Sequence, residues 1–268
     1  MEIDPAQNYQ TINRRLWDAR AEAHVRSKLY DVPAFIRKPF SLKEIEIGFL
    51  GDIRDKTVLH LQCHFGQDTI SLGQLGAQAT GLDFSGTAIE EARKLAQATA
   101  SDASFVCADV YDTSKVLGRT FDVVFSSYGT IGWLPDLRAW GRVVADCLKP
   151  GGRFVFAEFH PILWIFNDDF TKLEYSYFNR GLIVEEKAGT YADSSAVIDL
   201  PGVSWNHPLQ DVLGSLLEAG LTLNRFAEYD YSPYDCFPNT VETSPGHFMI
   251  KGMDGKIPMV YALEATKG

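Results

Sequence analysis

Hydrophobic positions change their spacing at about residue 57. From there, short apolar runs rich in β-branched and aromatic residues alternate with amphipathic segments. The runs predict strands at residues 57–63, 78–84, 104–109, 121–128 and 153–159. Helical spacing between them gives two buried faces, one with Ile89, Ala92, Leu95 and Ala96 and one with Leu137, Trp140, Val144 and Cys147/Leu148. We therefore predict an α/β fold with a mostly parallel sheet and helices on both faces.

Three further segments surround this core of residues 57–160 in a predicted single domain of residues 1–268. Residues 1–50 form a helical cap, with breaks at 31–33 and 38–39. Residues 162–204 are expected to insert a hairpin after the fifth strand, with a turn at 179–181 between runs at 175–178 and 182–184. Residues 205–268 add a helix from His207-Pro208 to Gly220, with a buried stripe at Leu209, Val212/Leu213 and Leu216/Leu217, and strands at 221–229 and 257–263 of the same sheet.

Composition narrows the possible partners. A net charge of −10 argues against nucleic acid, because phosphate binding needs clustered Lys and Arg. No apolar run is long enough to span a bilayer, and the N-terminus lacks the pattern of a signal peptide. The four scattered cysteines suit neither a disulfide framework nor a CxxC site, and Cys63, Cys107 and Cys147 are expected to be buried. We predict a cytoplasmic protein that binds neither nucleic acid nor membrane.

In a parallel sheet, ligands bind beyond the carboxyl ends of the strands. The first strand leads into the stretch HLQCHFGQDT at 60–69, which holds only one glycine, Gly66. A degraded phosphate loop, a metal site and a different cofactor loop are all conceivable there. His60 and His64 are separated by the end of a strand and a turn, which disfavours the His-x3-His geometry of a helical metal site. We predict that no metal binds.

The ends of the second and third strands add two acids. Asp83 lies 17 positions after Gly66, where a carboxylate can accept both ribose hydroxyls, although alone it is equally typical of a surface turn. Asp109 can accept from an adenine amine, with Phe84 and Val110 packed against the base, although alone it is typical of a helix N-cap. The loop and both acids, in this order, favour a nucleoside-type cofactor.

These residues resemble the class I S-adenosylmethionine (SAM)-dependent methyltransferases, especially a small-molecule-type subgroup of bacteria and archaea that carries LHLQCHFGQDT. The resemblance covers nearly the whole chain and includes WDARAEAH at 17–24, GLDFS at 81–85, SSYG at 126–129, WLPD at 133–136, LKPGG at 148–152, EFHP at 158–161, WNH at 205–207 and YSPY at 231–234. It implies a Rossmann-like seven-stranded sheet. The general family loop has an acid followed by Gly-x-Gly-x-Gly; here His60 stands for the acid and Gln62 and His64 for the first two glycines.

The resemblance implies SAM as cofactor, with S-adenosylhomocysteine as product. The loop should wrap the methionine part, Asp83 should hold the ribose, Asp109 and Val110 the adenine, and Ser126–Ser127 should lie beside the amino-acid part. Trp17 should cover the cofactor, with simple helix packing as the alternative. The full predicted SAM-binding set is Trp17, Gln62, His64, Gly66, Asp68, Thr69, Asp83, Phe84, Ser85, Asp109, Val110, Ser126 and Ser127.

Two expectations about the loop go beyond this set. Asp68 could replace the missing acid as counter-charge for the SAM ammonium, although an acid in a first helical turn is also favoured by the helix dipole. Because Gln62 and His64 carry side chains, their backbones should avoid positive φ, which glycine alone tolerates easily. A left-handed backbone at Gln62 or His64 would contradict the interpretation of HLQCHFGQDT as a subgroup-specific SAM loop that keeps only the last glycine, Gly66.

Methyl transfer from a sulfonium is an in-line displacement, and some acceptors also need a general base. The candidate catalytic residues are His160, Tyr128 and His207, with a structural role for His160 and capping for His207 as alternatives. The candidate acceptor-binding residues are His24, Trp133, Tyr191 and Trp205. The segment SSYG lacks the Asn/Asp-Pro-Pro-Tyr/Phe pattern used on base nitrogens, and no Pro-Cys pair is present in a position for cytosine methylation. We therefore predict a small-molecule acceptor, whose identity and attacked atom remain open, as does the oligomeric state.

Two other functions compete with an enzyme of this kind. A SAM-binding sensor or scaffold without activity would explain why the loop lacks the acid and two glycines. A nicotinamide-dependent oxidoreductase would need Gly-x-Gly-x-x-Gly after the first strand, which is absent.

Overall fold

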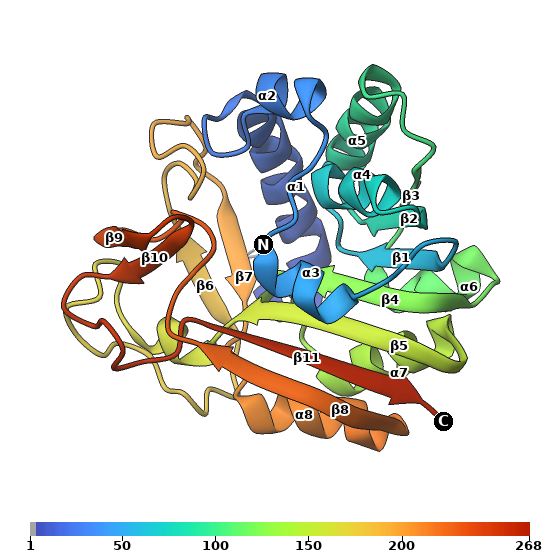
Figure 1. Cartoon of the computed structure of the whole chain (residues 1–268). Helices are drawn as coiled ribbons and strands as arrows, with labels where there is room; N and C mark the ends of the chain where they lie inside the picture. Colours follow the sequence, from blue (N-terminus) through green and yellow to red (C-terminus); the bar gives the residue numbers. More distant parts are fainter. Residues whose placement is uncertain (1–3) are drawn as a thin grey trace.

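A seven-stranded sheet forms the centre of the computed structural model, which describes residues 4–268 (Figure 1). Its strand order is β3-β2-β1-β4-β5-β11-β8, and β11 runs antiparallel to both of its neighbours, while the other neighbouring pairs are parallel. The strands are β1 (Thr57–Leu61), β2 (Gln78–Asp83), β3 (Ser104–Cys107), β4 (Phe121–Ser127), β5 (Leu148–Phe159), β8 (Leu221–Tyr229) and β11 (Val260–Lys267). The predicted Rossmann-like sheet is confirmed, although its last strand lies about three residues later than 257–263.

Helices cover both faces of this sheet because successive strand residues point to opposite sides. Phe154 and Phe156 of β5 pack with α7 (Leu137–Cys147) and α8 (Leu209–Glu218) on one side. Val155 and Ala157 pack with α3 (Glu44–Leu50) on the other. Near β2 and β3, α4 (Gln67–Gln74) and α5 (Gly86–Ala98) share a third cluster that contains Phe105. The predicted faces of α5 and α7 are buried, whereas Leu217 of the predicted α8 stripe is exposed.

The N-terminal cap consists of α1 (Pro5–Arg26), α2 (Val32–Arg37) and α3. Each predicted break coincides with a helix boundary. The Asp31 side chain accepts a hydrogen bond from the Ala34 N–H and so caps the start of α2, which ends just before 38–39. The helix α1 lies beside α5 and the strand β7 (Figure 1), and therefore above the end of the sheet where β1 and β2 finish.

The insertion contains a hairpin, but the predicted strand pairing was wrong. The strand β6 (Ile183–Glu186) pairs with β7 (Pro201–Ser204), and residues 175–178 form no strand. Asn179 closes a local turn by bonding the N–H and C=O of Gly181. Asn13 of α1 fixes β7 instead, since its side chain bonds both the N–H and the C=O of Val203 at 2.8 Å. The contacts of Asn13 in α1 with Val203 therefore fix β7, and not residues 175–178, as the partner of β6.

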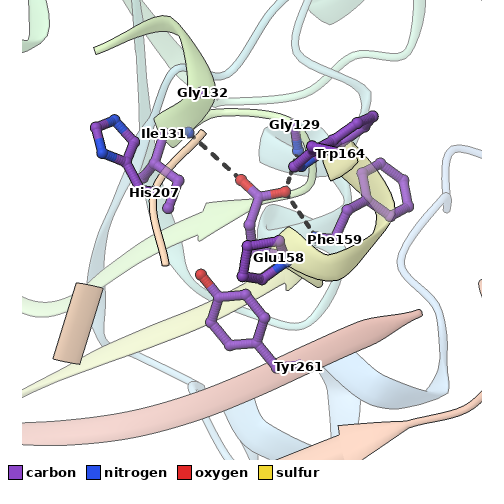
Figure 2. Close-up of a pocket in the computed structure, with 9 residues that line it drawn as sticks. Gly129, Ile131, Gly132, Glu158, Phe159, Trp164, His207 and Tyr261 are labelled. Carbon is purple, nitrogen blue, oxygen red and sulfur yellow. Dashed lines mark hydrogen bonds between the residues drawn. The ribbon is translucent and has the colours of Figure 1, made fainter. Parts of the chain in front are cut away.

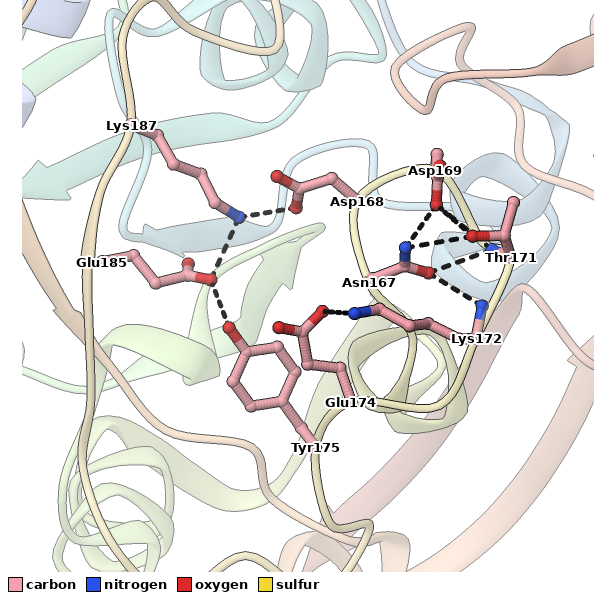
Figure 3. Close-up of polar contacts among 9 residues, drawn as sticks. All are labelled: Asn167, Asp168, Asp169, Thr171, Lys172, Glu174, Tyr175, Glu185 and Lys187. Carbon is pink, nitrogen blue, oxygen red and sulfur yellow. Dashed lines mark hydrogen bonds and ion pairs between the residues drawn. The ribbon is translucent and has the colours of Figure 1, made fainter.

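A polar cluster joins residues 167–175, in the first part of the insertion, to Glu185 of β6 and Lys187 just after it (Figure 3). The Lys187 ammonium lies 2.7 Å from Asp168 Oδ1 and 3.0 Å from Glu185 Oε1, and the Tyr175 hydroxyl donates to Glu185 at 3.0 Å. These groups are partly exposed, so the cluster contributes little to stability and mainly sets how the segment before β6 lies against it.

Several smaller elements complete the chain. A second hairpin, β9 (Thr240–Ser244) and β10 (His247–Ile250), lies between β8 and β11 and was not predicted. Short helices follow three strands: η1 (Val110–Asp112) with α6 (Thr113–Leu117), η2 (Ile131–Trp133) and η3 (Pro161–Ile165). Cys63 and Cys147 are buried as expected, but Cys107 is exposed because β3 ends there, near the edge of the sheet. None of the helices in residues 4–268 is both long and apolar enough to cross a membrane.

Candidate functional site

The loop after β1 has the backbone of a glycine-rich loop although two of its glycines are missing. Gln62 has a φ of 54°, His64 of 51° and Gly66 of 84°. The prediction that Gln62 and His64 avoid positive φ is therefore wrong, and with it the interpretation of this loop as one with a different backbone. A left-handed residue with a side chain costs about 1–2 kcal/mol, so other contacts must hold these two in place.

Those contacts come from three separate elements. The His64 N–H donates to Asp83 Oδ2 at 2.8 Å, and the Gln62 Nε2 donates to the Thr130 carbonyl at 2.9 Å. The His64 ring bonds the His24 ring, with 2.8 Å between Nε2 and Nδ1. The end of β2, the segment after β4 and α1 together fix the loop.

Within this loop, packing leaves no room for a side chain at Gly66. A Cβ at this position would lie 2.5 Å from the ring of Phe105 and 3.0 Å from Ala92 Cβ. The two other glycine positions carry side chains because the space beside their backbones is open to α1 and η2, whereas Gly66 faces the core between β3 and α5.

Asp83, at the end of β2, and Asp109, just after β3, lie at the carboxyl edge of the sheet, and each accepts hydrogen bonds from backbone N–H groups. Asp83 also accepts from the Ser85 N–H at 2.9 Å, and burial raises the pKa of its carboxyl to about 6. Asp109 accepts from the Tyr111 N–H at 2.9 Å and from Gln10 Nε2 at 3.0 Å, so it caps η1. Val110 is buried beside it and Phe84 is half-buried. Capping does not use up either carboxylate, because each can accept about four hydrogen bonds.

Two predicted cofactor residues lie beneath the loop. Thr69 is buried and bonds His60 Nδ1 at 2.9 Å, and Ser85 donates to Asp18 Oδ1 at 2.5 Å and caps α5. His60 lies within β1 as expected. Its ring bonds the Thr69 hydroxyl, whereas the ring of His64 bonds that of His24. Among residues 4–268, no three His, Cys, Asp or Glu side chains gather in a way that would hold a metal ion.

Helix α1 brings aromatic side chains over the loop. Trp17 meets the rings of His64 and Trp133 edge to face, with centroids 5.5 and 5.2 Å apart. The Arg20 guanidinium lies over both tryptophans, 5.1 Å from the Trp17 centroid and 5.3 Å from that of Trp133. Tyr191 of the insertion closes this group, since its ring lies 4.7 Å from that of His24. The structure thus brings five of the predicted side chains together near Arg20, which the sequence reasoning missed: Trp17, His24, His64, Trp133 and Tyr191.

Polar atoms in this region lack partners. Gln62 Oε1, Arg20 Nε and His24 Nε2 are buried and have no hydrogen-bond partner within the described part of the chain. Burial lowers the pKa of Arg20 but leaves a guanidinium charged, and that of His24 falls to about 3, so His24 is neutral. An unused acceptor on the loop and an unused cationic donor beside it match the ammonium and carboxylate of an amino acid, so these residues fit the amino-acid end of SAM.

Part of the predicted SAM-binding set keeps accessible surface, whereas Gly66, Thr69, Asp83, Ser85, Val110 and Ser126 of the same set are buried. Gln62, His64, Asp68 and Ser127 are half-buried, whereas their chain neighbours Leu61, Cys63, Phe65, Gln67, Thr69 and Ser126 are buried. The alternation shows that one side of the loop and of the β4 end is turned toward open space. Ser126 instead points inward, where its hydroxyl lies 3.3 Å from that of Thr130.

Glu158 at the end of β5 is a central residue that the sequence reasoning did not select. Figure 2 shows its carboxylate in a small pocket lined by Gly129, Ile131, Gly132, Phe159, Pro161, Trp164, His207 and Tyr261. It accepts from the N–H groups of Gly129, Thr130 at 2.8 Å, Ile131 at 3.4 Å and Phe159 at 2.7 Å. Burial raises the pKa of this carboxyl, and the backbone donors oppose that effect. Glu158 thereby sets the path of the chain after β4.

The two candidate histidines are both engaged by backbone. His160 Nδ1 accepts from the Ile162 N–H at 3.1 Å and caps η3, while its Nε2 lies 3.0 Å from Glu228 Oε1. His207 Nε2 bonds the Leu134 carbonyl at 2.8 Å, and its ring borders the Glu158 pocket. Burial lowers the pKa of both rings. The geometry agrees with the structural alternative for His160. The capping role expected for His207 was wrong, because the N-cap of α8 is Pro208 and His207 bonds the Leu134 carbonyl instead. The catalytic roles of both residues stay predictions.

Tyr128 lies at the meeting point of β4, α3 and α4. Its hydroxyl donates to Glu46 of α3 at 3.1 Å, and its backbone is left-handed with a φ of 43°. Asp68 is nearby in α4 and accepts from the Ser41 hydroxyl at 2.5 Å and from Ser127 at 3.3 Å. The last candidate, Trp205, donates its backbone N–H to the Gly132 carbonyl at 2.8 Å. Its ring packs edge to face against that of Tyr9 in α1.

Comparisons with known proteins agree with this geometry. A family model described as a methyltransferase domain matches residues 58–152, which run from β1 into β5. The chain is 27% identical over 143 residues to a ubiquinone biosynthesis O-methyltransferase of Serratia proteamaculans, and 25% identical over 135 residues to that of Idiomarina loihiensis. These matches cover 52% and 49% of this chain and 58% and 55% of the relatives, so the chain spans little more than half the length of the curated relatives.

Solved structures show the same fold over more of the chain. A SAM-dependent methyltransferase from Mesorhizobium loti superposes with a TM-score of 0.55 at 19% identity, covering 82% of this chain and 94% of its own. Magnesium protoporphyrin IX methyltransferase from Synechocystis PCC 6803, solved with bound SAM, gives a TM-score of 0.54 at 14% identity and covers 97% of both chains. The prediction of a SAM-dependent methyltransferase is confirmed at the level of the matched domain and its fold.

Proposed function

We propose that the protein transfers the methyl group of SAM to a small molecule. The observation that carries this proposal is the loop after β1, which keeps a left-handed backbone at Gln62 and His64 and holds the unpartnered acceptor Gln62 Oε1. Arg20, whose Nε is also unpartnered within the described part of the chain, lies over Trp17, and Trp17 contacts His64 of the loop. A loop strained at two positions and lined by unused polar atoms is suited to a bound ligand. The methyltransferase domain match over residues 58–152 supports SAM as that ligand.

Each part of SAM has residues that would hold it. Gln62 Oε1 would accept from the ammonium and Arg20 would donate to the carboxylate. Asp83 has lone pairs left for the ribose, and Asp109 with Val110 is placed for the adenine. When bound, SAM supplies a methyl group on a positively charged sulfur, which makes that carbon a strong electrophile.

The chain's own contribution is to align the acceptor and to exclude water. Aromatic rings extend from Tyr128 away from the loop: Phe159 lies 5.2 Å from Tyr128, and Phe237 lies 4.9 Å from Phe159. An apolar, ring-shaped acceptor suits such a wall. The curated relatives named O-methyltransferases favour oxygen as the attacked atom.

Calorimetric titration of SAM tests the binding part of the proposal. Arg20→Met keeps the side-chain stem but removes the charge, so the dissociation constant for SAM should rise about tenfold or more. Arg26→Met, an exposed arginine on the same helix, is the matched control and should bind SAM like wild type. Failure of wild type to bind SAM, or thermal stabilisation by NAD alone, would refute the proposal.

The substitution Asp68→Asn tests whether Asp68 also contributes to the site that would bind the ammonium group of SAM. Asp68 accepts from two serine hydroxyls, which its helix-terminal role would not require. A counter-charge role predicts a severalfold weaker affinity for SAM. An unchanged dissociation constant would leave Asp68 a helix-terminal residue only.

A further inference from the structure

Glu46 is a buried carboxyl group that the SAM site does not use. It lies on α3, has no exposed surface, and its Oε2 accepts from the Tyr128 hydroxyl at 3.1 Å. Its Oε1 accepts from the Lys43 N–H at 3.3 Å and lies 3.4 Å from the Tyr234 hydroxyl. An acid buried to this degree normally has an ion-pair partner, yet none pairs with Glu46 within residues 4–268.

The groups around Glu46 act on its charged form in opposite directions. The negative charge of Asp68 in α4 disfavours it, whereas the hydroxyl of Tyr128 after β4 favours it by donating a hydrogen bond. The hydroxyl of Tyr234, in the segment after β8, lies 3.4 Å away. The Lys43 ammonium lies 5.3 Å from the centre of the Tyr234 ring. Burial, followed by the negative charge of Asp68, raises the pKa of Glu46 to about 7. The group can therefore take up and release a proton near neutral pH.

Tyr128 is held in a strained conformation that directs its hydroxyl at Glu46. Its φ of 43° is unusual for an aromatic residue, and its N–H donates to the Ala157 carbonyl at 2.8 Å. The following residues, Gly129 and Thr130, are fixed by Glu158. Tyr128 as a whole residue is half-buried, as are its chain neighbours Ser127 and Gly129.

We infer that Glu46 is the final proton acceptor of the methyl transfer, reached through the Tyr128 hydroxyl, and that the methyl acceptor is a phenol. This inference rests on the proposed function. The phenol oxygen forms a bond to the methyl carbon, and the carbon–sulfur bond breaks with its electron pair left on sulfur. The phenol proton moves to the Tyr128 oxygen while the proton of Tyr128 moves to Glu46. Because Glu46 has no exposed surface, the proton returns through the Tyr128 hydroxyl and passes to water once the methylated product has left.

The acceptor class follows from the need for a base and from the walls of the site. A carboxylate is already ionised at neutral pH and needs no proton acceptor, whereas a phenol keeps its proton there. The aromatic wall of Tyr128, Phe159 and Phe237 continues to Trp164, whose ring lies 6.2 Å from Phe159 and whose side chain is 40% exposed. A flat aromatic acceptor can pack along these rings with its hydroxyl at Tyr128.

Capping of α3 does not by itself explain Glu46. Glu46 occupies the third helical position and accepts from the Lys43 N–H with one oxygen. Glutamine serves that cap equally well. The other oxygen, the one bonded to Tyr128, has no part in capping, so Glu46→Gln separates the two roles.

The decisive experiment measures methyl transfer from SAM to a panel of simple phenols and catechols as a function of pH. Wild-type kcat/KM should rise as pH passes through about 7, because the base acts when deprotonated. Glu46→Gln and Tyr128→Phe should lower kcat about 100-fold and abolish that rise. Glu44→Gln, the same change at an exposed position of α3, should keep both rate and profile.

Two further measurements separate this inference from the proposed function. SAM affinity should be the same in Glu46→Gln and wild type, and an aromatic thiol that is ionised at the assay pH should be methylated equally by both. If wild type binds SAM but methylates none of the phenols, or if Glu46→Gln keeps the wild-type pH profile, the inference is wrong while the proposed function stands. Loss of SAM binding in wild type would instead refute the proposed function itself.

Discussion

Two buried glutamates at the same end of the sheet have different surroundings. Glu158 of β5 accepts hydrogen bonds from backbone N–H groups, mainly those of Thr130 and Phe159. Glu46 of α3 accepts from one backbone N–H and faces two tyrosine hydroxyls. Burial raises the pKa of both carboxyls.

The donors decide what each acid can do. A backbone N–H cannot give up its proton, so Glu158 can only hold the chain after β4 in one path. A phenol can pass a proton on, so Glu46 is able to exchange one with whatever Tyr128 contacts. Glu158 therefore positions Tyr128 through the backbone that follows it. Glu46 is placed to exchange a proton with the Tyr128 hydroxyl.

Glu158→Ala should have the largest effect on stability. It leaves several buried N–H groups without an acceptor, and the free energy of unfolding should fall by about 3 kcal/mol. Glu158→Gln keeps one accepting oxygen and should lose roughly half as much. Urea denaturation at constant pH measures both. A loss well below 1 kcal/mol in the Ala variant would mean that the loop after β4 is fixed by other contacts.

Glu46→Gln should change how stability depends on pH. The pKa of Glu46 is raised to about 7 in the folded state, so its favourable contribution is present at low pH and is lost as pH rises through that value. Between about pH 5 and pH 8 the unfolding free energy of the variant should gain about 2 to 3 kcal/mol on wild type. Asp83, with a pKa of about 6, affects both proteins equally and cancels. Parallel curves would place the Glu46 pKa near its ordinary value.

His160→Ala should have the smallest effect. This residue directly follows the strand of Glu158, and its ring caps η3 through the Ile162 N–H. Loss of the cap should cost about 1 kcal/mol, and the pH profile of methyl transfer should keep its shape. A profile that loses its limb near neutral pH in this variant would transfer the role of base from Glu46 to His160.

The central sheet was predictable because its signals are local. Five apolar runs and two helical faces appear directly in the sequence, and each corresponds to a strand or to a buried helix face, although β3 at the sheet edge is buried only at Phe105. The insertion was harder, since residues 201–204 carry no strong strand pattern and Asn13, almost 190 positions away, selects them. The hairpin of β9 and β10 was missed for a similar reason, as its strands are short and largely exposed.

The candidate site was predictable where the chain order fixed it and not where side chains meet across elements. Asp83, Asp109 and Tyr128 follow strands, so the sequence located them at the right edge. Arg20 and Glu46 belong to the helical cap. Arg20 lies within WDARAEAH, between the predicted residues Trp17 and His24, but was not selected, and nothing in the sequence around Glu46 marks it as functional. Only the packing of the cap on the sheet brings Arg20 to the tryptophans and Glu46 to Tyr128.

The sequence by itself determined the order of strands and helices, the edge of the sheet that carries the candidate site, and the loop HLQCHFGQDT at 60–69. These follow from periodicity and from the geometry of parallel sheets, which depend on neighbours in the chain. The tertiary structure decided the backbone of that loop. Gln62 and His64 take a conformation disfavoured by their own side chains because Thr130, Asp83 and His24 supply hydrogen bonds that offset the strain. Such contacts join residues far apart in the chain, and no local pattern encodes them.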